Sequence, residues 1–443
     1  MEDFSFYIPY MVLFTWTVLA YFLVKNIMPD YTNMVSANHS MDWVQSGFSI
    51  TATFVVSSMM LLSAGFSYTY GIMAPLSLIV AYAVSYYIYG HYASLIKHNN
   101  KSFVTLSDVM NEKIGKVTGL IMKSQFTIAP VYSIIINLLG IKLALQVFGF
   151  DTNDQIIFST IASALVISYC WRGGLVSSIR TDVIQTLVLI VTGIVIFAAV
   201  TIGNTAPLVA FLDRPLNWDA VANPGLLFFF IFSAALFADI ELHNRISAMK
   251  SSVTVKKSFK LAAILTAIPV ILYGLLGGYA IGDISPATSA LPTVIENMDT
   301  VIQVIFILMI IVLLTSNLDS SLVASATMIT EEWTPEKNIK IFRLAMIGTA
   351  IFAIGIASLN IRLVEIFMIY AAVRLATLPV IIAFAKQIVI DDKKWAWFFL
   401  ASIVLGAIAL YTIKMQSLPI AYTLMSYIGI VGISSLGLLR YGR

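Results

Sequence analysis

The stretch from Leu313 to Glu332, LLTSNLDSSLVASATMITEE, brings hydroxyl, amide and carboxylate groups into a segment that continues an almost wholly apolar run, 301–314. Such a run predicts a helix inside a membrane. At about 100° per residue, one stripe of this helix and its flanks would carry Ser316, Asn317, Asp319, Ser320, Ala324 and Thr327. A carboxylate in hydrocarbon costs about 2.5 to 3.5 kcal/mol on the insertion scale, so Asp319 requires a cation or a hydrogen-bond donor. Alternatively, the hydroxyls only mediate close helix packing.

The composition places the chain among polytopic helical membrane proteins. Of its 443 residues 59% are hydrophobic and 11% are charged, which excludes a soluble domain, and its apolar runs are too long for an outer-membrane barrel. The sequence contains no nucleotide-binding loop, Cys/His metal cluster or hydrolase signature, so it predicts no enzyme. The net charge of +3 comes from loops and indicates no nucleic-acid partner. No obligatory protein partner is inferred.

Apolar stretches near twenty residues predict about thirteen transmembrane helices. They are 8–27, 46–66, 72–96, 118–147, 156–172, 181–203, 224–240, 258–282, 299–328, 341–360, 363–385, 395–413 and 418–439. Alternate loops are rich in Lys and Arg, among them 97–116 and 245–260, whereas the other loops hold mostly acids. The positive-inside rule then places the N-terminus outside and the C-terminus inside. We expect a multi-pass protein of the cell membrane, most simply a bacterial inner membrane.

Two further motifs accompany the polar stretch. Residues 173–185 read GGLVSSIRTDVIQ, and residues 243–250 read HNRISAMK. The first is similar to the signature of the sodium:solute symporter family, in which a Gly-Gly turn precedes a helix that opens with Thr-Asp and then Gln. The second resembles the family's loop after the helix that opens its second repeat, and the polar stretch resembles the family's Ser-Ser-x-Asp-Ser segment. The stretch from Ala52-Thr53-Phe54 to Tyr68-Thr69-Tyr70-Gly71 resembles the start of the family's core, and with it these likenesses extend over about residues 40–335.

The resemblance implies a LeuT-like core of two inverted five-helix repeats. On this sequence the chain divides into a leading helix, two repeats and two trailing helices, at 1–45, 46–203, 224–385 and 386–443. The first helix of each repeat is expected to be broken near the middle of the membrane. In the first repeat the polar residues between Ser49 and Ser58 mark where such a break is tolerated, because freed carbonyls there can line a cavity or hold an ion.

The resemblance also implies sodium as the coupling ion. Family ligands for one sodium ion fall on Thr51, Phe54, Leu313, Ser316 and Asn317. Asn317 departs from the usual Ser or Thr, although an amide oxygen also binds hard cations. In some members a second sodium ion is bound, and its ligands here would be Asp182, Asp319 and Ser320 together with Ser316. Those carboxylates would suit one cation, or a cation and a proton.

The chemical class of the solute is inferred mainly from Arg374. It lies near the middle of the span 363–385, where arginine faces a cavity, a carboxylate or an anionic ligand. It therefore favours a solute with a carboxylate, such as an amino acid or a monocarboxylate. The alternative is a structural ion pair with Asp239 or Asp319. The other residues expected at the solute are Thr53, Ser57, Ser58 and Phe232.

The sequence therefore predicts a secondary active transporter that imports a small organic solute with sodium by alternating access across the lipid bilayer. Two alternatives stay open. Asp182 and Asp319 allow coupling to protons in place of sodium. A solute sensor derived from a transporter would share the fold, but no kinase or receiver segment is attached to this chain.

Overall fold

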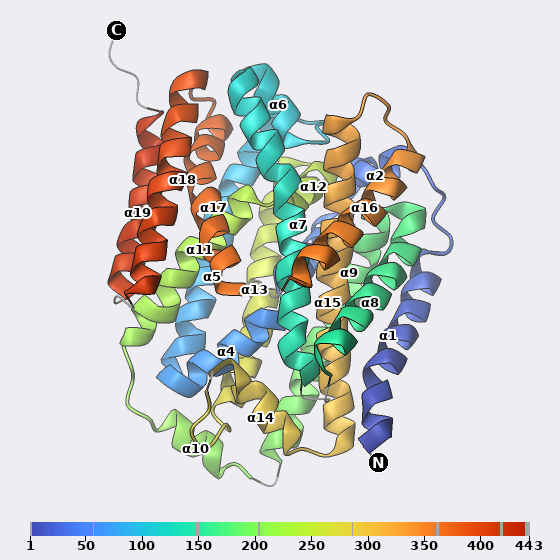
Figure 1. Ribbon diagram of the computed structural model, residues 1–443, viewed down its shortest axis with the longest axis vertical. Coiled ribbons are helices and arrows are strands. Elements are labelled where there is room, and N and C mark those ends of the chain that lie inside the picture. Colours follow the sequence, from blue (N-terminus) through green and yellow to red (C-terminus); the bar gives the residue numbers. More distant parts are fainter. Residues whose placement is uncertain are drawn as a thin grey trace.

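The computed structural model describes residues 2–55, 57–146, 150–202, 204–285, 287–359, 363–416 and 420–438, which form a bundle of helices joined by short loops (Figure 1). Over these residues there is no β-strand, only an isolated bridge between Met41 and Met249. The prediction of an all-α membrane protein is confirmed.

The predicted membrane segments coincide with helices or with a bent helix pair. Among the described residues ten helices are long and apolar enough to cross a membrane, and one bent pair brings the number to eleven. Two shorter apolar helices, Tyr370–Ala385 and Ala421–Leu436, occupy the positions of two more predicted spans. The positions of the spans therefore agree with the sequence, while their number depends on how these shorter helices are counted.

The first half of the bundle contains α1 (Glu2–Val24), α2 (Tyr31–Ser36), α3 (Trp43–Phe54), α4 (Ser57–Tyr70), α5 (Met73–Asn99), α6 (Leu106–Lys113), α7 (Lys116–Gln146), α8 (Thr152–Gly173), α9 (Leu175–Thr201) and α10 (Ala206–Leu212). The second half contains α11 (Leu227–Ala238), α12 (Ile240–Ala248), α13 (Ser252–Gly277), α14 (Ala290–Glu296), α15 (Thr300–Met328), α16 (Ile339–Ala357), α17 (Leu363–Ala385), α18 (Asp392–Met415) and α19 (Ile420–Leu436).

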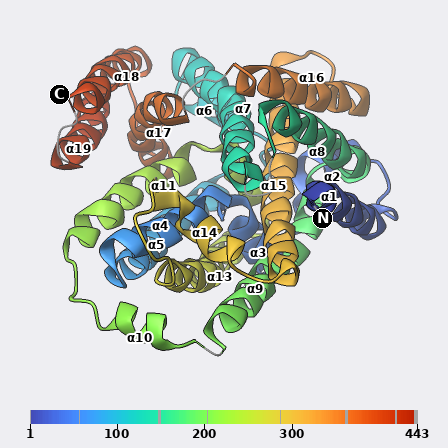
Figure 2. The same ribbon diagram turned by 60° about the horizontal axis from the view of Figure 1, so that its bottom comes forward.

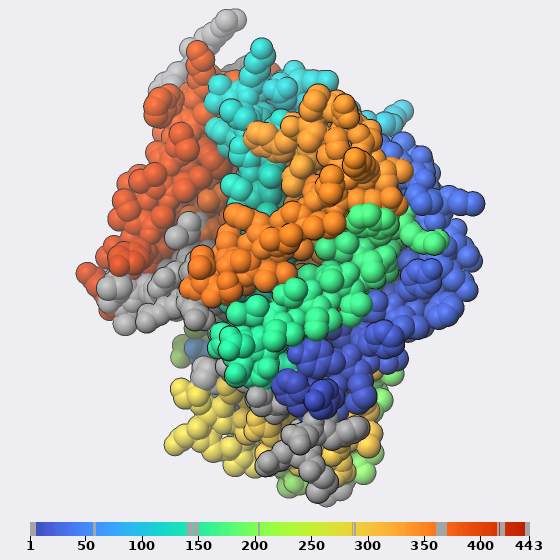
Figure 3. All heavy atoms as spheres, turned by 45° about the vertical axis from the view of Figure 1, so that its right-hand side comes forward, coloured from blue at the N-terminus to red at the C-terminus, as the bar shows by residue number. Residues whose placement is uncertain are grey.

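Helix α15 runs through the interior of the bundle (Figure 2). Between Met309 and Met328 every one of its residues is buried, because α3, α7, α9 and α16 pack around it. On one face α1, α8 and α16 lie as adjacent diagonal bands (Figure 3), while α18 and α19 form the opposite edge (Figure 2). The polar stretch of α15 is thus held between helices from both halves of the chain.

Two helices of the bundle are interrupted. Helix α3 ends at Phe54, and after Val55 (φ −87°, ψ 90°) the chain continues as α4 at an angle of 65°. Helix α11 ends at Ala238, where Asp239 is extended (φ −92°, ψ 123°) before α12 begins. The first break lies within the polar stretch 49–58 where the sequence led us to expect it, whereas the second lies at the end of the predicted span 224–240 and not near its middle. Carbonyls at the end of α3 are freed for other partners.

The segment 240–248 corrects one expectation. The sequence placed residues 243–250 in a cytoplasmic loop, but the structure folds Ile240–Ala248 into a helix whose residues are all buried. Two of its polar side chains have partners inside the bundle: Arg245 pairs with Asp182, and His243 contacts the main-chain oxygen of Phe237 at 2.9 Å. The amide of Asn244 is buried without a hydrogen-bond partner among the described residues. These contacts offset the cost of removing charged and polar groups from water.

Candidate functional site

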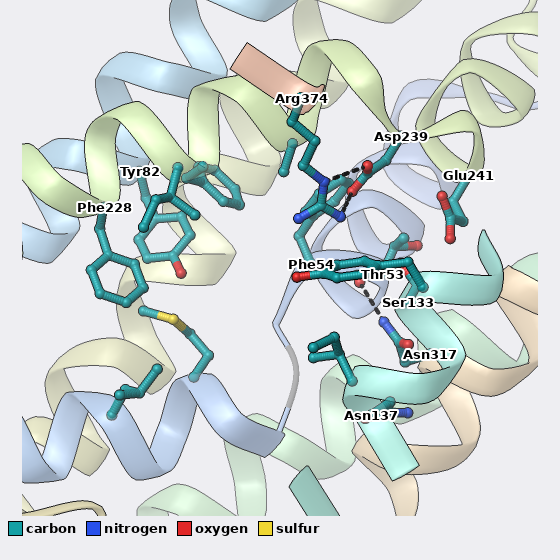
Figure 4. A pocket seen from close by; sticks show the side chains of 17 residues that line it. Thr53, Phe54, Tyr82, Ser133, Asn137, Phe228, Asp239, Glu241, Asn317 and Arg374 are labelled. Carbon is teal, nitrogen blue, oxygen red and sulfur yellow. Dashed lines mark hydrogen bonds and ion pairs between the residues drawn. The ribbon is translucent and has the colours of Figure 1, made fainter. Parts of the chain in front are cut away.

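A cavity of about 150 Å³ lies beside the two helix breaks. It is bordered by α3, α4, α5, α7, α11, α15 and α17, together with Asp239 and the start of α12 (Figure 4). One side is apolar and aromatic. The other side carries Thr53, Asn137, Asn317, Glu241 and the pair of Asp239 with Arg374.

The aromatic wall is built around Phe232 on α11. Its ring centroid lies 4.1 Å from that of Tyr82, 5.1 Å from Tyr86 and 5.5 Å from Phe54, all in edge-on contacts. Phe232 and Thr53, which the sequence suggested as solute residues, therefore both line the cavity. The side chains of Ser57 and Ser58, suggested with them, lie outside the described residues.

Arg374 forms a two-pronged ion pair with Asp239 in the cavity wall (Figure 4). Its Nε lies 2.9 Å from Oδ1 and its Nη2 lies 2.5 Å from Oδ2. The guanidinium also lies 4.9 Å and 4.7 Å from the ring centroids of Tyr132 and Tyr370, within the range of cation–π attraction. The partner is Asp239 and not Asp319, so the positive charge of Arg374 is balanced within the protein.

Glu241 is a cavity residue that the sequence reasoning did not find. Its side chain is buried, and Oε1 accepts a hydrogen bond of 2.9 Å from the hydroxyl of Ser321. Its other oxygen, Oε2, is buried and has no hydrogen-bond partner among the described residues. The sequence does show an acidic residue directly after the predicted span 224–240. Because residue 241 was placed in the loop that follows this span, it was not considered for the site.

The broken end of α3 meets α15 at the residues expected to hold sodium. The Ser316 hydroxyl donates to the Ala52 carbonyl at 3.1 Å, and Asn317 Nδ2 donates to the Thr53 carbonyl at 3.3 Å. The carbonyl of Thr51 accepts from the Val55 amide at 2.8 Å. Asn317 Oδ1 is buried without a partner in the described part of the chain.

These groups suit a hard cation. Carbonyl, hydroxyl and amide oxygens are its preferred ligands, and a helix C-terminus carries partial negative charge. Phe54 ends α3 at this point, and buried Leu313 lies on α15 one turn before Asn317. The five expected ligand residues therefore come from the two segments that meet here.

Asp182 of α9, expected to bind a second sodium ion, is paired with Arg245 of α12. Arg245 Nη2 lies 2.9 Å from Asp182 Oδ2 and 2.6 Å from the hydroxyl of Ser320. Asp182 also accepts hydrogen bonds from Ser49 at 2.5 Å and from Ser316 at 3.1 Å. The guanidinium thus lies among the residues that the sequence assigned to a second ion.

Among the described residues, the side chain of Asp319 accepts hydrogen bonds from hydroxyl groups alone. It accepts from Ser178 at 2.7 Å, Tyr169 at 2.9 Å, Thr181 at 3.0 Å and Ser320 at 3.2 Å. No salt bridge to Asp319 is found in the described ranges. With both carboxylates ionised, Asp182, Asp319 and Arg245 carry one net negative charge in the interior of the bundle.

Comparisons with known proteins bear on the family and the fold. Residues 35–215 match the model of the sodium:solute symporter family. No curated protein matches the sequence. The fold is similar to that of a substrate-bound, outward-open sodium-coupled sialic acid symporter, with a TM-score of 0.79, 16% identity and 97% coverage of both chains.

A second solved structure, the nucleobase-cation-symport-1 family transporter Mhp1 in a closed conformation with bromovinylhydantoin bound, has a TM-score of 0.60 and 12% identity. The match covers 93% of this chain and 94% of Mhp1. Its inward-facing form has a TM-score of 0.54 at 14% identity, with coverage of 90% and 92%. At these identities the likeness concerns the fold.

Proposed function

We infer that this chain belongs to the sodium:solute symporter family, because residues 35–215 match the family model and the fold matches that of a sodium-coupled symporter over 97% of the chain. From this premise we propose that it imports a small organic solute together with sodium by alternating access. The observation that carries the proposal is the contact of Ser316 and Asn317 with the broken end of α3, directly beside the cavity.

This contact provides a route for coupling. Thr53 lines the cavity, and its carbonyl accepts the hydrogen bond from Asn317. Sodium held between the end of α3 and α15 would draw these two helices together and position Thr53 and Asn317 toward the solute. Ion binding and solute binding would then each favour the other, as linkage requires.

The membrane potential supplies enough free energy to accumulate the solute inside. One positive charge moving inward across about 100 mV releases about 2.3 kcal/mol. At 1.4 kcal/mol per tenfold, this corresponds to about fifty-fold accumulation of a neutral solute, before the concentration gradient of the ion is added.

For the conformational change we propose that segments 46–203 and 224–385 act as the two inverted repeats. The interruptions at Val55 and Asp239, in the helix that opens each segment, support this division. Rocking of one helix bundle against the other around these breaks would expose the cavity to either side of the membrane in turn.

The test is uptake into proteoliposomes that contain the purified protein, with candidate solutes supplied outside. Replacement of external sodium by choline, at fixed pH and voltage, should abolish accumulation. If uptake persists without sodium but follows an imposed pH gradient, the proton-coupled alternative through Asp182 and Asp319 replaces the proposal.

A further inference from the structure

Three buried hydrogen-bond acceptors on the polar side of the cavity have no donor among the described residues. The amide of Asn137 donates to the Leu314 carbonyl at 3.0 Å, and that of Asn317 donates to the Thr53 carbonyl at 3.3 Å. In both residues the amide oxygen is left buried without a partner in the described part of the chain, as is Oε2 of Glu241. A ligand that supplies a donor would stabilise this site, because a buried polar group without a hydrogen-bond partner is destabilising.

These acceptors lie on neighbouring turns of the site. Ser321, which donates to Glu241 Oε1, is one helical turn from Asn317 on α15. Asn137 lies on α7 and contacts α15 just before that turn, at Leu314. Figure 4 shows Glu241, Asn317 and Asn137 on the same side of the cavity, with the aromatic residues Tyr82 and Phe228 opposite.

The charges that line the cavity also favour a ligand with hydrogen-bond donors and a positive charge. Arg374 is matched by Asp239 through two hydrogen bonds, whereas Glu241 has no basic partner among the described residues. With all three ionised, the cavity wall carries one net negative charge. In a site shielded from water this charge attracts a cation and disfavours an anion.

We propose that the transported solute carries a protonated nitrogen with N–H donors, an ammonium or guanidinium group, which binds Glu241 Oε2 and the neighbouring amide oxygen of Asn137, while the amide oxygen of Asn317 serves the sodium ion. This inference rests on the proposed function and gives its substrate class. It replaces the emphasis on a carboxylate, which depended on a free positive charge at Arg374. A quaternary amine is excluded from the class because it has no N–H to donate, and the tyrosine rings beside Arg374 already face a cation.

The experiment is a thermal-shift and binding screen of the purified protein in sodium, with solutes in matched sets. Each set contains an amino acid, the amine left after decarboxylation, the acid left after deamination, and the fully methylated amine. Neutral sugars and amides complete the panel. We expect stabilisation only by members with a protonated N–H group.

The variant Glu241→Gln should weaken binding of a stabilising amine by about tenfold or more, since it replaces a charged hydrogen-bond acceptor with a neutral one. Its sodium affinity measured without solute should be that of the parent, since linkage acts only when solute is bound. The matched control is Glu112→Gln, at an exposed position of α6, which should bind like the parent. If Glu241→Gln does not fold, Glu241→Asp keeps the charge but withdraws it, and should lower the affinity while keeping the preference for the amine over the deaminated acid.

Binding of a deaminated acid or a neutral solute as tight as that of the amine overturns the inference. So does a panel in which no amine stabilises the protein, or an effect of Glu241→Gln on sodium affinity alone. A sodium-dependent neutral solute would refute only this inference. An amine bound and transported without sodium would refute the proposed coupling instead.

Discussion

Arg245 Nη2 lies 2.9 Å from Oδ2 of Asp182, and both side chains are buried in the centre of the bundle. Loss of one member of such a pair leaves the other as an uncompensated buried charge, which costs about 3 to 5 kcal/mol. The pair joins α9 to α12, and Ser49 of α3 hydrogen-bonds to both of its members. It therefore links three helices around the proposed ion site.

The first prediction concerns this pair. Asp182→Asn should destabilise the purified protein strongly, because Arg245 then lacks its counter-charge. The double variant Asp182→Asn with Arg245→Met, in which neither charge remains, should recover most of the lost stability. Unfolding followed by temperature or denaturant measures both. A single variant as stable as the parent would mean that the pair is not formed in the folded protein.

Much of this architecture could be predicted from the sequence, because the thickness of a bilayer determines the length of an apolar helix. The polar stripe of α15 was also predicted, since polar residues such as Ser316, Asn317 and Asp319 inside an apolar membrane helix usually belong to a binding site. Arg245 was misplaced because basic residues next to a span usually lie in cytoplasmic loops. Glu241 was missed because the turn of the chain at Asp239, which aims it into the cavity, depends on packing that no local pattern records.

The second prediction concerns the number of ions. Since Arg245 compensates Asp182, the carboxylate left for a second cation is Asp319, whose partners in the described part of the chain are hydroxyl groups. We expect a Hill coefficient above one for sodium in the parent and a coefficient near one in Asp319→Asn. The ratio of charge to solute moved in proteoliposomes should fall by one.

A Hill coefficient of one in the parent, with one charge per solute, would remove the second cation. If the ratio depends on pH and not on sodium, Asp319 carries a proton instead. The matched control is Asp108→Asn, at an exposed position of α6, for which both quantities should be those of the parent.

The third prediction concerns the first ion. Ser316→Ala removes a hydroxyl that contacts both the Ala52 carbonyl and Asp182. We expect the sodium concentration for half-maximal uptake to rise by about tenfold, in line with the loss of a hydrogen-bonding ligand to a charged group. Ser325→Ala is the control, because Ser325 is a buried serine of the same helix whose hydroxyl contacts Thr349 on α16. Equal sodium dependence in the two variants would place the ion elsewhere.

The last prediction distinguishes two roles of Arg374: neutralising Asp239 and contacting the solute. Arg374→Gln leaves Asp239 as an unpaired carboxylate, which should cost about 3 to 5 kcal/mol of stability and impair folding as well as transport. The double variant Arg374→Gln with Asp239→Asn removes both charges and should restore stability, because two amides can still hydrogen-bond in the same place. If Arg374 serves mainly to neutralise Asp239, the double variant should also retain sodium-dependent uptake of a cationic solute, measured in proteoliposomes beside the parent. If it folds like the parent but binds no solute, the pair itself contacts the solute; a loss seen also with Arg374→Lys, which keeps the charge but not the planar pair of donors, would assign the contact to Arg374.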